Sequence, residues 1–362
     1  MMHWSKCFGL FILCCMFLYS CDNGKQESLL SVSVLDGTLK SIEMLPSSLI
    51  PLETNDNSLL YDIVNIEVLE DKYYIHSRGF VRVFDGNGNY LCDLAKKGQG
   101  PDEYLALSNM FLIGDTLCLF DSERKGVMQF SENGEFLGLS KIQKDKLDSN
   151  APSPTRIAPY MGGWLSLNMY GGASWKRPVF STWNKELDQY QMVDGRDLSS
   201  GFLFADMFYV DNERVLYWEL AKDTLFVMND HTLTPLYHID FGEKALPNDV
   251  LQEKDVYKRL SFLGTDKSEQ YAGVARYYQR KGDALYFCYF YPGDEGVEVR
   301  LCRYNEKSNK VDNYRFISID GKYKLEPFFK IHEDKIIFSV KNLEDDIQNP
   351  LLYIIPIADL DQ

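Results

Sequence analysis

The chain has 362 residues, of which 45% are hydrophobic, 14% aromatic and 25% charged. This composition supports a large folded core and excludes a disordered protein. The formal net charge of -15 argues against binding of nucleic acid, which needs concentrated Lys and Arg, and against electrostatic attachment to anionic lipid.

The N-terminal segment has the pattern of an export signal. Lys6 precedes an apolar run from Cys7 to Tyr19. The run is shorter than the roughly 20 residues that a membrane-spanning helix needs, so a secretory signal peptide fits better. It leads to "LYSC", which ends at Cys21 and resembles a bacterial lipobox, where cleavage leaves the cysteine N-terminal and lipidated. A plain signal peptide with an incidental cysteine is the alternative.

These features divide the chain into three parts. We expect residues 1–20 to be a lipoprotein signal peptide, residues 21–40 to be the lipidated Cys21 and a flexible linker, and residues 41–362 to be one folded domain. A multiply acylated cysteine anchors firmly, because each buried CH₂ contributes roughly 0.8 kcal/mol. The expected location is the cell envelope, at the outer membrane, on a face that the sequence does not specify.

The first folded segments form an internal repeat. Residues 81–94, "VRVFDGNGNYLCDL", and residues 126–139, "GVMQFSENGEFLGL", both read as strand, Asn-Gly turn and strand. Asn-Gly between alternating hydrophobic residues is the strongest short signal for a β-hairpin. Alternating strands precede each hairpin at 72–77 and 116–121. The repeat therefore predicts units of about four short strands each.

Fainter copies continue the repeat along the chain. They contain the strand pairs 163–168 with 179–184, 214–220 with 224–229, 284–290 with 298–305, and 335–340 with 351–357. Six units of short, evenly spaced strands predict an all-β fold, a six-bladed β-propeller. The last unit lacks a fourth strand, and the segment 47–53 is a spare strand ahead of the first unit. We therefore expect the N-terminal strand to complete the last blade, with an open solenoid as the alternative.

Four cysteines belong to the folded domain: Cys92, Cys118, Cys288 and Cys302. Cys288 and Cys302 flank a predicted hairpin and, if directly opposed, would lie close enough for a disulfide. Four buried free thiols are the alternative.

At this level of detail the chain resembles a known family. "FDGNGNYLCDL", "KKGQGPDEY" and the terminal "NPLLYIIPIADL" are similar to segments of the six-bladed β-propeller lipoproteins of Bacteroides-type bacteria. The resemblance implies an exported, lipid-anchored propeller of TolB-like or NHL-like type. It brings no agreed activity and no catalytic residue.

The segment Lys96–Leu105, "KKGQGPDEYL", lies where the first unit crosses to the second. Its two glycines and one proline fit a tight, rigid return. Such crossings share a face with the loops between second and third strands, and that face usually holds the ligand of a propeller. Glu103 and Tyr104 are therefore candidate ligand contacts. In the structural alternative, an acidic side chain accepts backbone N–H groups and Tyr104 packs between blades.

Other loops of the same face supply further candidates. Exposed aromatic residues beside charged groups suit sugars or peptides, and the alternative is that they only cap the blades. The candidates are Arg124, Tyr170, Trp175, Lys176, Arg177 and Tyr291. Asn65 and Asn109 fall in register on two inner strands, where they could hold a ligand or serve as satisfied structural amides. The long crossing at 246–270 predicts a short helix or lid after Pro247.

Motifs for catalysis are missing from the sequence. The histidines and cysteines have no zinc-ligand spacing, and there is no nucleophile elbow or Walker loop, so we predict no metal, cofactor or catalytic residue. The leading hypothesis is a lipid-anchored binding or scaffold module for a glycan, peptide or envelope protein. The alternative is a propeller enzyme, a metal-dependent lactonase-like hydrolase or a lyase, with its active site at the mouth of the central channel.

Overall fold

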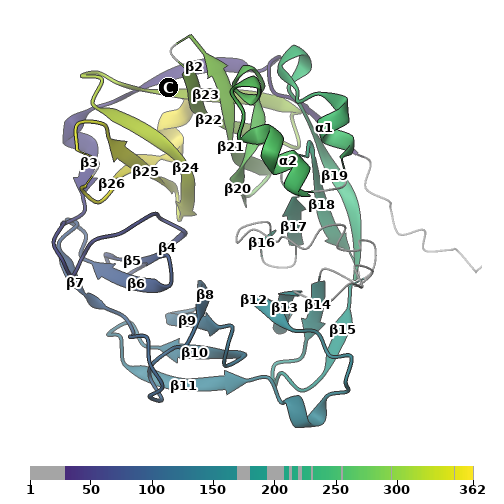
Figure 1. The fold of residues 1–362 in the computed structure, drawn as a ribbon. Helices are drawn as coiled ribbons and strands as arrows, with labels where there is room; N and C mark the ends of the chain where they lie inside the picture. The colour runs from purple at the N-terminus through teal and green to yellow at the C-terminus, as the bar shows by residue number, and fades with distance from the viewer. Residues whose placement is uncertain are drawn as a thin grey trace, which may run out of the picture.

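The computed structural model is an all-β ring of six small sheets, so the predicted six-bladed β-propeller is confirmed (Figure 1). Each sheet is one blade, and the blades follow one another around a common axis in chain order. The structure describes residues 29–168, 180–193, 208–211, 214–218, 222–229, 231–253, 256–294, 296–345 and 347–361.

Each blade has four antiparallel strands, counted here from the axis outward, and blades one to six are numbered along the chain. The innermost strands are β4 (Asn65–Leu69), β8 (Leu107–Ile113), β12 (Pro154–Tyr160), β16 (Phe208–Asp211), β20 (Gly273–Lys281) and β24 (Tyr323–His332). The second strands are β5 (Lys72–Ser77), β9 (Thr116–Asp121), β13 (Gly163–Asn168), β17 (Arg214–Trp218), β21 (Ala284–Gly293) and β25 (Lys335–Asn342). The third strands are β6 (Phe80–Phe84), β10 (Gly126–Phe130), β14 (Phe180–Trp183), β18 (Thr224–Asn229), β22 (Gly296–Asn305) and β26 (Leu351–Pro356). The fourth strands are β7 (Tyr90–Asp93), β11 (Phe136–Lys141), β15 (Tyr190–Met192), β19 (Thr232–Asp240), β23 (Lys310–Ser318) and β3 (Leu49–Pro51).

Helical structure within the described residues is short. It consists of the helices α1 (Asn248–Gln252) and α2 (Val256–Leu263), and of the 3₁₀ turns η2 (Pro46–Ser48), η3 (Lys144–Lys146), η4 (Gly242–Lys244), η5 (Asp266–Gln270) and η6 (Ile357–Asp361). Both helices and η5 belong to the long crossing from β19 to β20, so the helix predicted after Pro247 is confirmed.

The two predicted Asn-Gly hairpins join the third and fourth strands of blades one and two. Gly88 and Gly134 have φ angles of +85° and +79°, in the region that favours glycine. Phe84 and Phe130 occupy equivalent positions before each turn, and each pairs with an aromatic residue across it. The repeat in the sequence thus reflects a repeat in backbone geometry.

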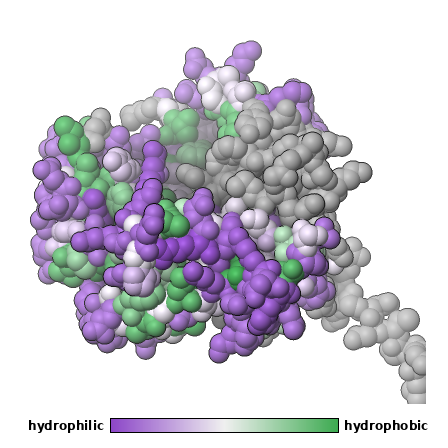
Figure 2. Space-filling view, turned by 60° about the horizontal axis from the view of Figure 1, so that its bottom comes forward, coloured by the Kyte–Doolittle hydropathy of each residue, from purple (hydrophilic) through white to green (hydrophobic). Residues whose placement is uncertain are grey.

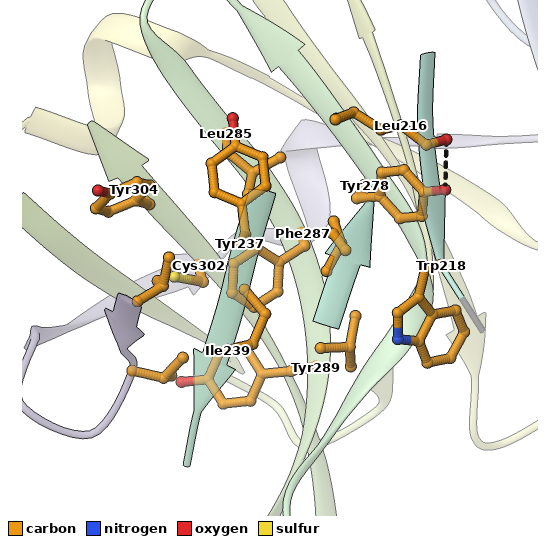
Figure 3. Close-up of a cluster of buried hydrophobic side chains, with 14 of the residues drawn as sticks. Leu216, Trp218, Tyr237, Ile239, Tyr278, Leu285, Phe287, Tyr289, Cys302 and Tyr304 are labelled. Atoms are coloured by element: carbon orange, nitrogen blue, oxygen red, sulfur yellow. Dashed lines mark hydrogen bonds between the residues drawn. The ribbon is translucent and has the colours of Figure 1, made fainter. Parts of the chain in front are cut away.

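The hydrophobic core lies between blades rather than inside one central layer. Six clusters of buried side chains occupy the six blade-to-blade interfaces. Figure 3 shows the cluster between blades four and five, where Tyr237 lies against Phe287 and the hydroxyl of Tyr278 donates to the Leu216 carbonyl oxygen over 3.0 Å. Burial of each such side chain contributes about 2 kcal/mol.

The ring closes between blades six and one. Phe328 and Ile337 of blade six share a cluster with Ile66 and Ile75 of blade one. The predicted N-terminal closing strand is confirmed: β3 pairs antiparallel with β26 and becomes the fourth strand of blade six. In the part of the chain that the structure describes, blade six therefore packs against blade one, and neither of them is exposed as the end blade of a linear array would be.

Two further N-terminal strands extend the ring in a way that the sequence did not predict. β1 (Leu30–Ser33) pairs parallel with β19, and β2 (Thr38–Met44) pairs parallel with β23, so blades four and five each gain a fifth strand. The side-chain amide of Asn313 donates over 2.8 Å to the carbonyl oxygen of Val34, which lies in the segment between β1 and β2. From Leu30 onward, therefore, the segment expected to be a linker packs against the propeller.

The molecular surface is mostly hydrophilic on the side that Figure 2 shows, with hydrophobic residues scattered among polar ones. Scattered apolar residues are normal on the surface of a folded domain and need no partner. No helix among the described residues is long and apolar enough to cross a membrane.

The four cysteines of the domain are free thiols, and three of them are buried while Cys92 is exposed. Cys288 pairs with Leu301 and Cys302 with Phe287, so the two cysteines are adjacent in register rather than opposite. Successive side chains of a strand point to opposite faces, and Cys302 accordingly packs towards blade four while Cys288 packs towards blade six. This geometry excludes the Cys288–Cys302 disulfide.

We expect one thiol to react in the native protein and four to react after unfolding. Burial raises the pKa of the Cys118 thiol to about 12 and also raises the pKa of the Cys288 and Cys302 thiols, so none of the three supplies thiolate at neutral pH. Counting thiols with Ellman's reagent on a chain that starts at Leu29 checks this, and Cys92→Ser should remove the native reaction. Two fewer thiols after denaturation without reductant would contradict it.

Candidate ligand-binding cleft

The crossing from blade one to blade two is held by its own polar groups. The Glu103 carboxylate accepts a hydrogen bond from the N–H of Gly100 over 2.7 Å. A Cβ on Gly98 would overlap Glu103 Oε2, so a larger residue there would displace the Glu103 carboxylate. The Arg124 guanidinium donates to the carbonyl oxygens of Gly98 and Gly100 at 3.3 and 2.9 Å. Glu103 and Arg124, both ligand candidates, thus serve to fix the turn.

Tyr104 has a structural place as well. It is 3% exposed and packs in the cluster between blades one and two. Burial, followed by the nearby charge of Asp93, raises the pKa of its hydroxyl to about 12. These contacts favour the structural alternative for this stretch.

Two of the crossings between neighbouring blades are held in place by polar side chains. These side chains lie at the end of a second strand or in the loop that follows it. The carboxylate of Asp121 is fully buried and accepts from the N–H groups of Leu105 and Ala106 at 2.7 and 3.2 Å. Ser77, at the equivalent position of blade one, accepts from the N–H of Tyr61 over 3.1 Å. Asn349 accepts from Leu60 on the crossing into blade one. We call the side of the propeller on which these residues lie the crossing face. On this side the crossings between blades meet the loops between second and third strands.

Asn65 and Asn109 bridge neighbouring inner strands. Asn65 donates to the carbonyl oxygen of Met110 over 2.9 Å. Asn109 donates to the carbonyl oxygen of Ile157 over 2.7 Å and accepts from its N–H over 3.2 Å. Their shared register therefore reflects a repeated structural amide.

The remaining candidates are in two groups. Tyr291, on β21, lies beneath the guanidinium of Arg300, whose central carbon is 3.7 Å from the ring centre. Tyr170, Trp175, Lys176 and Arg177 lie outside the described residues.

The central channel contains a cavity of about 690 Å³ lined by inner strands of all six blades. Within it, Lys330 of blade six donates to both carboxylate oxygens of Glu67 of blade one at 2.9 Å. This ion pair spans the interface that closes the ring.

A second cavity, of about 540 Å³, lies beside the long crossing between blades four and five. We call it the crossing cleft. Its apolar floor is formed by residues of the buried cluster between blades four and five, among them Ile239, Ala272 and Val274. Its walls come from the loop before β18, the end of β19, the segment 245–273, and the hairpin of β21 and β22.

The rim of the crossing cleft is polar and mostly acidic. Asp223, Asp240 and Glu269 line it, together with His238 and Lys222. Nδ1 of His238 lies 3.6 Å from an Asp223 carboxylate oxygen. An apolar cavity of this size with a few convergent polar groups has the features of a small-molecule site.

The insertion that walls the cleft is fastened to the blades. Lys222, in the loop before β18, donates from Nζ to the carbonyl oxygen of Leu251 at the end of α1. Its backbone carbonyl oxygen accepts from the indole N–H of Trp218 over 2.8 Å. The N–H of Ala272 bonds to the carbonyl oxygen of Lys244 over 2.7 Å. The cleft is thus a built feature of the fold.

Sequence reasoning identified the long crossing at 246–270 but not the acidic residues of the cleft. The signal available was weak, because Asp223, Asp240 and Glu269 are far apart in the chain and carry no common motif. Within the described residues, no three His, Cys, Asp or Glu side chains come together as possible metal ligands.

A family model for a domain of unknown function, DUF4934, matches residues 45–350, which include every strand of the six blades except β1, β2 and β26. The chain belongs to the DUF4934 family. The matched region starts just before the closing strand β3, so the family domain and the closed ring nearly coincide.

Two solved structures share the fold of this DUF4934 propeller. One is a protein described as exported, from Bacteroides fragilis, with 17% identity and a TM-score of 0.58 over 88% of this chain and 99% of that one. The other is a member of the DUF4221 family from Bacteroides vulgatus, with 11% identity and a TM-score of 0.55 over 85% of this chain and 96% of that one. At these identities the likeness shows the fold alone. No curated protein matches the chain.

Proposed function

We propose that the protein is an exported, lipid-anchored binding module that takes up its ligand in the crossing cleft. The observation that carries the proposal is a 540 Å³ apolar cavity with a polar rim, on a face where the loops of a propeller gather. A glycan, a peptide or part of an envelope protein would present its apolar surface to the floor and its polar groups to the rim.

The lipid anchor of this proposal rests on the lipobox at Cys21, and the exported location is consistent with the relative described as exported. A TolB-like or NHL-like relationship is part of the same proposal, as is an outer-membrane location. Binding of nucleic acid is not expected, because the net charge is -15. No specific observation among the described residues favours the enzyme alternative.

A variant that fills the cleft tests the proposal. Gly273 lines the cleft, has no positive φ, and has no atom within 4 Å of the position that a Cβ would occupy. We expect Gly273→Phe to fold and to lose ligand binding. Thermal-shift and NMR titrations with oligosaccharides, peptides and small metabolites would compare it with the wild-type chain from Leu29.

The matched control is Leu137→Phe, which adds an aromatic ring at a 56% exposed position on β11, in blade two. It should bind as the wild type does. Ligands that bind Gly273→Phe as tightly as the wild type, or a wild type that binds nothing in the panel, would contradict the proposal.

A further inference from the structure

We infer that the crossing cleft selects a small organic cation, a protonated amine carried on an apolar body. This inference rests on the proposed function and narrows the ligand of the same site: whichever molecule binds, the part that enters the cleft carries a protonated amine. It combines three features of one cavity: an excess of carboxylates, aromatic walls and an apolar floor.

The charged residues that line the cleft are unequal in sign. Asp223, Asp240 and Glu269 are acidic, Lys222 is basic, and His238 carries a charge only when it is protonated. The Lys222 ammonium group is already committed to the backbone, since it donates to the carbonyl oxygens of Leu251 and Glu253. The cleft therefore has a formal excess of negative charge.

The three carboxylates have few partners of their own. Asp223 accepts from the hydroxyl of Thr224 over 2.9 Å and faces His238 at 3.6 Å, which is too long for a strong hydrogen bond. Asp240 accepts from the N–H of Gly242 over 2.7 Å. Among the described residues, no Lys or Arg forms an ion pair with any of the three. A ligand that enters with a positive charge would meet oxygens able to accept from it.

The walls add a second attraction for a cation. Phe241, Tyr271 and Phe290 line the same cavity. Aromatic faces attract ammonium groups by about 0.5–2 kcal/mol, and more strongly where water is excluded. An anion would be repelled by the rim, and a neutral ligand would desolvate the carboxylates without replacing their bonds to water. The apolar floor then suits the body of the ligand rather than its charged end.

Three probes of one shape and different charge test the inference: 2-phenylethylamine, 2-phenylethanol and phenylacetate. Saturation-transfer NMR and calorimetry on the chain from Leu29 should rank the amine first and phenylacetate last. Glu269→Gln, at an exposed position, should weaken amine binding about two- to fivefold and leave the alcohol unchanged. Combining it with Asp223→Asn and Asp240→Asn should remove the preference for the amine.

The control is Asp283→Asn, which removes one carboxylate at the turn between β20 and β21, where Asp283 pairs with Lys307 rather than lining the cleft. It should not change amine binding. High salt should weaken binding of the amine but not of the alcohol.

The outcomes separate this inference from the proposed function. If the alcohol binds as well as the amine and Gly273→Phe abolishes both, the cleft is a site but not one for cations. If the amine binds equally well to Gly273→Phe, or if no probe binds the wild type, the inference is wrong. The proposed function is wrong only if the wider panel of oligosaccharides, peptides and metabolites also binds Gly273→Phe as tightly as the wild type, or does not bind the wild type at all.

Discussion

A chain that starts at Leu52 is expected to lose cooperative folding, because it lacks the strand that closes the ring. β3 supplies the fourth strand of blade six, and its Leu49 is buried while Ile50 packs in the cluster between blades six and one. Without it, β26 becomes an open edge. Two lost side chains at about 2 kcal/mol each, with the lost pairing, approach the whole stability of a typical domain.

The comparison that isolates β3 uses a chain that starts at Leu45. This chain lacks β1 and β2 but keeps the closing strand. Urea unfolding followed by tryptophan fluorescence and circular dichroism should give a single cooperative transition for the Leu45 chain. The Leu52 chain should be partly unfolded or aggregated without denaturant. Equal midpoints for the two chains would show that closure does not depend on β3.

The second large effect concerns pH and a buried histidine. His76, on β5, is 3% exposed, and its Nδ1 has no hydrogen-bond partner among the described residues. Burial, followed by the charge of Arg156, lowers its pKa to about 3. In the unfolded chain a histidine titrates near 6.5. Between that pH and about 3, His76 is therefore protonated in the unfolded state but neutral in the folded state.

The free energy of unfolding should consequently fall as the pH is lowered from 6.5 towards 3. The slope from this residue is about 1.4 kcal/mol per pH unit, so roughly 2 kcal/mol is lost by pH 5. His76→Leu should flatten the profile between pH 6.5 and about 4, whatever it does to stability at neutral pH. Urea unfolding across this range is the measurement.

The matched control for His76 is His332→Gln, a change at a partly exposed histidine at the end of β24. This variant should keep the steep pH profile of the wild type. A wild-type profile that is flat between pH 6.5 and 4 would contradict the assignment to His76.

The propeller could be predicted from the sequence because its signals are local. Asn-Gly turns at Gly88 and Gly134 require a backbone that few other residues adopt, and period-2 strands flank them. The closing strand could be deduced by counting strands in the last unit. The strands β1 and β2 could not, since they pair in parallel with partners more than 190 residues away and have no turn signal.

The candidate site was less predictable for a different reason. The segment "GQGPDEY" was a candidate because of its unusual composition. The structure shows that this segment forms a turn held by the Glu103 carboxylate. The acidic rim of the cleft instead combines residues from a loop, a strand end and a 3₁₀ turn. Only the three-dimensional arrangement of blades four and five brings them together.

The strands β1 and β2 have a mechanical consequence if the protein is anchored at its N-terminus, as proposed above. Tension on the tether would first reach β1, which holds blade four through four residue pairs. The seven pairs of β2 come next, and the closing strand lies behind both. Under load β1 would detach first while the ring stays closed. The strands β1 and β2 would therefore protect the propeller from force applied at the N-terminus.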